Sequence, residues 1–98
     1  MNIVQIEEIL AYYETTYEFC LSFLRIERSQ KMIAEALETA EGAVERAILH
    51  YAYAEGCFKN DQLEEAYPHW KKALHYAKGV GLTAYIAKIQ SHLAIYWY

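Results

Sequence analysis

Six side chains in the sequence could ligate a transition metal: Cys20, Cys57, His50, His69, His75 and His92. Zinc sites usually take their ligands from closely spaced motifs such as C-x-x-C or H-x-x-x-H, because the ligands must converge on one ion. The sequence contains neither spacing, and His69 and His75 are placed on different faces of a helix. The sequence therefore predicts no metal site, and the two cysteines are interpreted as buried free thiols.

Paired carboxylates are the other candidates for chemistry. Glu7–Glu8 and Glu64–Glu65 are adjacent in sequence, so the members of each pair point to different faces of a helix and do not act together. The sequence also lacks a glycine-rich phosphate loop and a nucleophile elbow. We therefore expect no enzymatic activity, no catalytic residues and no cofactor.

Composition indicates one folded helical domain. The 98-residue chain is 55% hydrophobic and has one proline and four glycines, which favours helix over disorder. A net charge of −4 does not indicate a nucleic-acid or membrane partner. No apolar run approaches the roughly 20 residues that span a bilayer, and the first residues lack a basic signal-peptide region. Two cysteines without a secretory signal predict a reducing, cytoplasmic location.

An internal repeat indicates how the chain is organised. Arg25–Gly42 aligns without a gap to Gln62–Gly79, at a spacing of 37 residues, and Cys20 falls opposite Cys57. A period in the thirties is typical of stacked helix pairs, each of which buries its apolar face against its neighbours. A generic helical bundle whose Ala and Leu spacing repeats by chance is the alternative.

The apolar periodicity predicts an all-α fold of five helices. They are expected at about residues 2–23, 26–41, 43–59, 62–78 and 83–98.

Several residues predict where these helices end. Asp61 is expected to N-cap the fourth helix, with Glu64 completing a capping box. Gly42 and Gly79 are expected to end the second and fourth helices in the left-handed conformation that suits glycine. Pro68 lies inside the fourth predicted helix and removes one backbone hydrogen bond, so we expect either a bend there or a later start of the helix.

The segment Ala54–Leu74 resembles a tetratricopeptide repeat (TPR). Ala54 and Ala66 stand at the small positions of the two helices of such a repeat, and Trp70 stands at its large aromatic position. The sequence departs from the family where Cys57 replaces the usual tyrosine and where no proline closes the unit. The resemblance implies one domain over residues 1–98, built from two antiparallel helix pairs and an unpaired C-terminal helix.

The resemblance also implies a concave groove that is lined by the first helix of each pair and binds a partner. The matching positions in this chain are Glu14, Glu18, Tyr51, Glu55, Phe58, Lys59, Lys88, His92 and Ile95. Three glutamates occupy positions where some family members use Lys and Asn to bind a C-terminal carboxylate, so we expect a different ligand. A basic or amphipathic helical segment of another protein fits this lining better. The alternative is that the charges are the solvated faces of amphipathic helices.

The predicted C-terminal helix ends in the apolar sequence Ile95–Tyr98. Tyr85 and Tyr96 are expected to face the side where a further helix of the repeat would lie, and Tyr98 is expected to face the groove. A large uncovered apolar patch usually marks an interface, so these three tyrosines are predicted to form one. A second copy of the chain, another protein or the remainder of a longer chain would cover it, unless the first helix folds back and shields it.

The sequence as a whole predicts a small TPR-like protein–protein interaction module, which would serve as an adaptor, a chaperone-like protein or a regulatory subunit. Its expected partner is a protein or peptide, with a second copy of the chain included. An obligate homo-oligomer with a structural role is the main alternative. A ligand-sensing regulator or an enzyme with a pocket between the helix layers is less favoured.

Overall fold

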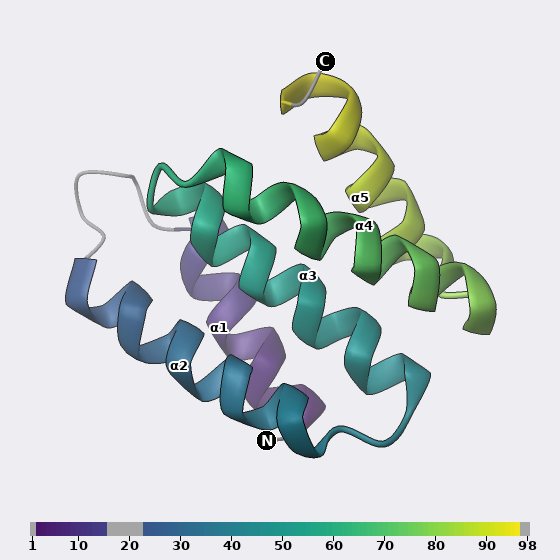
Figure 1. Ribbon diagram of the computed structural model, residues 1–98, viewed down its shortest axis with the longest axis horizontal. Coiled ribbons are helices and arrows are strands. Elements are labelled where there is room, and N and C mark those ends of the chain that lie inside the picture. Colours follow the sequence, from purple (N-terminus) through teal and green to yellow (C-terminus); the bar gives the residue numbers. More distant parts are fainter. Residues whose placement is uncertain (1, 16–22, 97–98) are drawn as a thin grey trace.

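The computed structural model describes residues 2–15 and 23–96, and these residues form five α-helices without a strand (Figure 1). The helices are α1 (Ile3–Thr15), α2 (Phe23–Thr39), α3 (Ala43–Lys59), α4 (Leu63–Val80) and α5 (Thr83–Tyr96). The predicted all-α fold with five helices is thereby confirmed. The segment 16–22, which the prediction included in the first helix, lies outside the described residues, as do Tyr17, Glu18 and Cys20.

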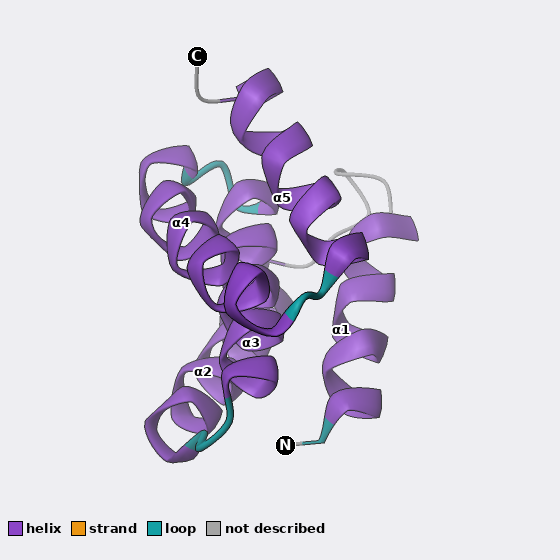
Figure 2. Cartoon of the chain, turned by 90° about the vertical axis from the view of Figure 1, so that its right-hand side faces the viewer, coloured by secondary structure: helices purple, strands orange, loops and turns teal. Residues whose placement is uncertain are grey.

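Helix α3 is the centre of the fold. It packs against each of the other four helices, and α4 also packs against α5. Figure 2 shows α1 and α5 on one side of α3, and α2 and α4 on the other. Helices α1 and α5, which are far apart in the sequence, therefore share one face of the molecule on the same side of α3.

The buried residues of the core recur at the spacing of an α-helix. On α4, Ala66, Trp70, Ala73 and Ala77 are fully buried and recur every three to four residues, so they form one stripe. Ala54 on α3 is fully buried as well. Small side chains let two helix backbones approach closely, which is why alanine dominates the face that α4 turns to the core.

A close approach between α1, α2 and α3 depends on Gly56. A Cβ atom at this position would lie 2.9 Å from Cγ of Gln30 and 3.0 Å from the hydroxyl oxygen of Tyr13. Tyr13 is fully buried, and its hydroxyl forms a hydrogen bond with Ser29 on α2. The missing side chain of Gly56 thus leaves room for polar groups that link the first two helices to the third.

Cys57 is a buried free thiol. Gln30 donates a hydrogen bond from Nε2 to its Sγ over 3.1 Å. Burial raises the pKa of this thiol to about 11, so it stays protonated and unreactive at neutral pH.

The turn between α3 and α4 differs from the prediction. Asp61 adopts a left-handed conformation with a φ of 59°, and the Gln62 amide donates to the Cys57 carbonyl over 2.8 Å. This bond closes the C-terminus of α3 in the manner of a Schellman motif. Asp61 is used in ending α3 and is not the N-cap of α4. That position belongs to Gln62, which forms no side-chain cap hydrogen bond.

The predicted roles of two glycines are also wrong. Helix α4 continues past Gly79 and is ended by Gly81, which has a φ of 72°, with the Leu82 amide bonded to the Ala77 carbonyl at 3.0 Å. Gly42 is the N-cap of α3 in an extended conformation, whereas α2 already ends at Thr39.

Pro68 does not delay the start of α4, which begins five residues earlier at Leu63. The proline removes the amide that would bond to the Glu64 carbonyl. Both residues are exposed, so water can satisfy that carbonyl.

Candidate functional site

Helices α1, α3 and α5 line two adjoining clefts on the face that they share. The first, here called the aromatic cleft, has a volume of about 350 Å³ and is lined by Glu14, Tyr51, Glu55, Phe58, Lys59, Lys88, His92 and Tyr96. The second, here called the acidic cleft, has a volume of about 340 Å³ and is lined by Glu7, Leu10, Ala11, Glu14, Ala84, Tyr85 and Lys88. Glu14 and Lys88 belong to both clefts, so the two together form one groove.

Most of the residues predicted for the groove come together in the aromatic cleft. Its lining contains all of the nine predicted residues except Glu18 and Ile95. Glu18 lies outside the described residues. Ile95 lines neither cleft, and 65% of it is exposed.

Tyr85 and Tyr96 lie on the groove side of α5, which corrects the prediction that they face outward. The ring of Tyr85 meets the ring of Tyr51 edge-on at 5.5 Å between centroids. The ring of Tyr96 lies 4.4 Å from that of Phe58. Tyr85, Lys88, His92 and Tyr96 are spaced by three or four residues, so one face of a helix presents all four. Tyr98, the third residue of the predicted interface, lies outside the described residues.

A buried carboxylate forms the floor of the aromatic cleft. Glu55 is only 3% exposed. Trp70 donates from Nε1 to Oε1 of Glu55 over 3.3 Å, and Nδ1 of His92 approaches the same oxygen to 2.7 Å. The approach has no hydrogen-bond geometry, and Nδ1 of His92 is a buried nitrogen without a hydrogen-bond partner among the described residues. The prediction treated Glu55 as an accessible groove charge, whereas its carboxylate is directed at groups of the protein itself.

Tyr51 shares this floor. Burial raises the pKa of Tyr51 well above its ordinary value, and the negative charge of Glu55 raises it further. The Tyr51 hydroxyl is therefore neutral, and it is already engaged by a hydrogen bond to Glu55, which raises the pKa as well.

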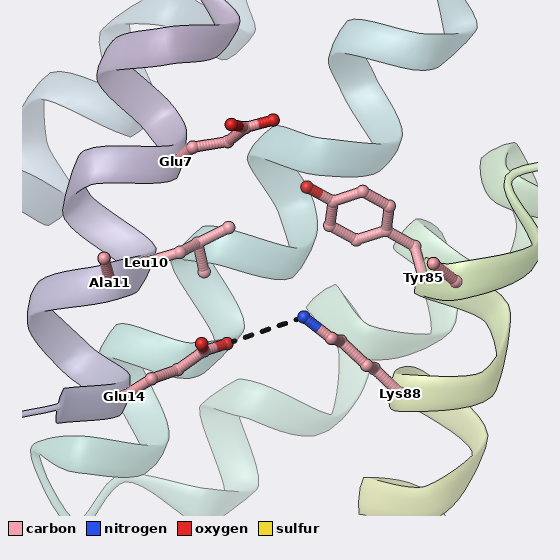
Figure 3. Close-up of a pocket in the computed structure, with 7 residues that line it drawn as sticks. Glu7, Leu10, Ala11, Glu14, Tyr85 and Lys88 are labelled. Carbon is pink, nitrogen blue, oxygen red and sulfur yellow. Dashed lines mark ion pairs between the residues drawn. The ribbon is translucent and has the colours of Figure 1, made fainter.

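The acidic cleft contains three exposed charged residues, Glu7, Glu14 and Lys88 (Figure 3). Glu14 and Lys88 form an ion pair across it, with 3.9 Å between Oε1 and Nζ, and both side chains are about half exposed. Nζ of Lys88 also lies 5.9 Å from the centre of the Tyr85 ring. Burial raises the pKa of Tyr85, and the negative charges of Glu7 and Glu14 raise it further.

Sequence reasoning missed the part of α1 that lines the acidic cleft. Glu7, Leu10, Ala11 and Glu14 follow the spacing i, i+3, i+4, i+7, which places them on one helical face. Once Glu14 was assigned to the groove, this spacing could have identified the other three. Trp70 was assigned only to the large aromatic position of a TPR, and its hydrogen bond to Glu55 depends on tertiary packing that the sequence does not display.

Two kinds of feature are absent from residues 2–15 and 23–96, which the structure describes. These residues contain no group of three or more His, Cys, Asp or Glu side chains placed to hold a metal ion. Among them, too, there is no helix with the length and apolar character needed to cross a membrane.

A histidine pair joins α3 to α4 away from the groove. Nδ1 of His50 and Nδ1 of His69 lie 3.1 Å apart, and the ring of His50 stacks on Tyr76 at 5.9 Å between centroids. Burial lowers the pKa of both histidines. In the neutral pair one ring donates its proton to the other, whereas protonating both rings would place two positive charges in contact.

Acid is therefore expected to weaken the packing of α3 against α4. Burial, with added repulsion from His69, Lys72 and Arg46, lowers the pKa of His50 from 6.5 to about 4. The unfolded chain binds more protons than the folded chain between these values, so stability is full above about pH 6.5 and is lost as the pH falls toward 4. Because His50 is only half-buried, solvent screening reduces this loss to about 1–2 kcal/mol.

Urea titrations at pH 7 and pH 4.5 test this expectation. Between pH 7 and pH 4.5, the free energy of unfolding of the wild type should fall by about 1–2 kcal/mol more than that of His50→Gln. His75→Gln, which changes an exposed histidine of α4, should behave as the wild type does. Equal losses in the wild type and His50→Gln would show that the pair does not contribute.

No protein-family model matches the chain, and comparisons with curated proteins and with solved structures likewise gave no match.

Proposed function

We propose that this chain is a small TPR-like protein–protein interaction module, acting as an adaptor, a chaperone-like protein or a regulatory subunit, that binds a segment of another protein in its groove. The observation that carries this proposal is the groove itself, which gathers side chains of α1, α3 and α5 into two adjoining clefts. The resemblance of Ala54–Leu74 to a TPR supports it, because the family binds partners on the corresponding face.

The lining of the groove suits a protein ligand. Phe58 and Tyr96 provide aromatic surface in the aromatic cleft, and aromatic side chains are enriched where proteins bind one another. Lys59, Lys88 and Glu14 surround them with charge, which orients a partner more than it strengthens binding. The proposal involves neither catalysis nor a cofactor. The buried thiol of Cys57 fits a reducing compartment such as the cytoplasm.

Blocking the groove should abolish binding of a peptide ligand. Ala84 is exposed and lines the acidic cleft, so Ala84→Trp should fill it with little loss of stability. Peptide ligands can be selected on the wild type from a random 16-residue phage library. We expect these peptides to bind Ala84→Trp at least about tenfold more weakly than they bind the wild type, which is equivalent to 1.4 kcal/mol.

The matched control is Ala87→Trp, which adds the same side chain at an exposed position of α5 that lines neither cleft. Titrations by calorimetry should give it the affinity of the wild type. If no selected peptide distinguishes Ala84→Trp from Ala87→Trp, the groove is not the binding site and the proposal fails.

A homo-oligomer with a structural role is the second candidate. Val80 at the end of α4 is 41% exposed and Ile95 on α5 is 65% exposed, and neither is a groove residue. Light scattering on the isolated chain separates the two candidates. Self-association would give twice the chain mass, and Ile95→Ser should restore the monomer if these apolar residues form the contact.

A further inference from the structure

The acidic cleft contains more negative than positive charge. Glu7 and Glu14 extend from α1, and Lys88 extends from α5 as the only cation among the described residues of the lining. Glu7 makes no ion pair within the part of the chain that the structure describes. Figure 3 shows Glu7 and the Tyr85 hydroxyl directed into the same space above the Glu14–Lys88 pair.

Lys88 shows what kind of group this cleft accepts. Its ammonium group lies 3.9 Å from the Glu14 carboxylate and 5.9 Å from the centre of the Tyr85 ring, a distance at which a cation is attracted to an aromatic ring. The ion pair is long and about half exposed, so it is weak and a better-placed cation can replace it. Leu10 and Ala84 provide apolar surface beside it for the methylene groups of a long side chain.

We propose that the acidic cleft is a binding site for an arginine or lysine side chain of the partner protein, which displaces Lys88 from Glu14 and pairs with Glu7 and Glu14. This inference rests on the proposed function, since it names the ligand of part of the same groove. Arginine suits the site better than lysine, because its planar guanidinium can stack on Tyr85 while it donates to a carboxylate.

The lining of the neighbouring aromatic cleft indicates which other side chains the bound segment carries. Its remaining glutamate, Glu55, is buried and held by Trp70 and His92, whereas Lys59 and Lys88 supply positive charge. A second cation is therefore not favoured there. We expect the bound segment to place one basic side chain over α1 and apolar or aromatic side chains beside Phe58 and Tyr96.

The test uses the random 16-residue phage library, selected on the wild type and counter-selected on Ala84→Trp. The retained peptides should share an arginine or lysine at one position. Calorimetry should then show about three- to fivefold weaker binding by Glu14→Gln and about threefold tighter binding by Lys88→Gln, as expected for exposed charge pairs. Replacing the shared basic residue of the peptide by glutamine should remove both effects. Glu8→Gln is the matched control, because Glu8 lies on α1 but lines neither cleft of the groove.

The outcomes separate this inference from the proposed function. If groove-dependent peptides are neutral or acidic, or if Glu14→Gln and Glu8→Gln bind them equally well, the inference is wrong and the proposed function stands. If no peptide depends on the groove, both are wrong. If light scattering shows a dimer that Ala84→Trp dissociates, a second copy of the chain occupies the groove, and the inference is overturned as well.

Discussion

Replacing Trp70 by alanine is expected to lower the free energy of unfolding by about 3–5 kcal/mol, which is the range for deleting a large core aromatic. Trp70 is fully buried, and its ring lies 6.0 Å from that of Phe58 and 5.4 Å from that of His92. Alanine would leave a cavity between α3, α4 and α5, because helices that are fixed by other contacts collapse only partly around it. Urea titration followed by circular dichroism measures the loss.

Trp70→Phe separates the ring of Trp70 from its hydrogen bond. Phenylalanine keeps most of the apolar volume but cannot donate to Glu55, so a smaller loss of about 1–2 kcal/mol is expected. Similar m-values for all three proteins would show that the unfolded states are comparable. A loss below about 1 kcal/mol in Trp70→Ala would mean that Trp70 is not a core residue.

Replacing Glu55 by alanine is expected to lower the free energy of unfolding by about 2–3 kcal/mol. The change removes the oxygen that accepts from Trp70 and lies 2.7 Å from His92. A buried donor left without an acceptor costs about 1–3 kcal/mol. Nδ1 of His92 is buried and makes no hydrogen bond even in the wild type, so this cost falls on the Trp70 donor. The desolvation of the carboxylate in the wild type offsets part of it.

Glu55→Gln is the matched variant. Its amide oxygen can accept from Trp70 and its volume is nearly unchanged, so a loss of less than about 1 kcal/mol is expected. In a double-mutant cycle, Trp70→Phe should cost less in the Glu55→Ala protein than in the wild type, because the hydrogen bond is already absent. Additive losses would show that the two side chains do not interact.

The sequence predicted those features that depend on the period of one helix. The start of α3 at Ala43 and its end at Lys59, like the burial of Trp70, follow from apolar and small residues that recur every three or four positions. The groove residues of α3 came from the resemblance to a TPR, and Tyr51, Glu55 and Phe58 do share one face of that helix.

Features that depend on two or more helices were not predictable in this way. Glu55 is buried because Trp70 and His92, at distant positions in the sequence, surround its carboxylate. The contact of His50 with His69 likewise depends on how α4 is rotated against α3. The roles of Asp61 and Gly81 were missed because several neighbouring residues could each end a helix, and backbone conformation decides between them.

The central position of α3 has a consequence for how the chain unfolds. In an extended helical repeat each unit contacts only its neighbours, so terminal units can fray while the middle stays folded. Here one helix packs against all four others, and removing any of them exposes apolar surface of α3. The described helices should therefore melt together in one cooperative transition, and a partner that holds α1 and α5 would stabilise the entire domain against unfolding.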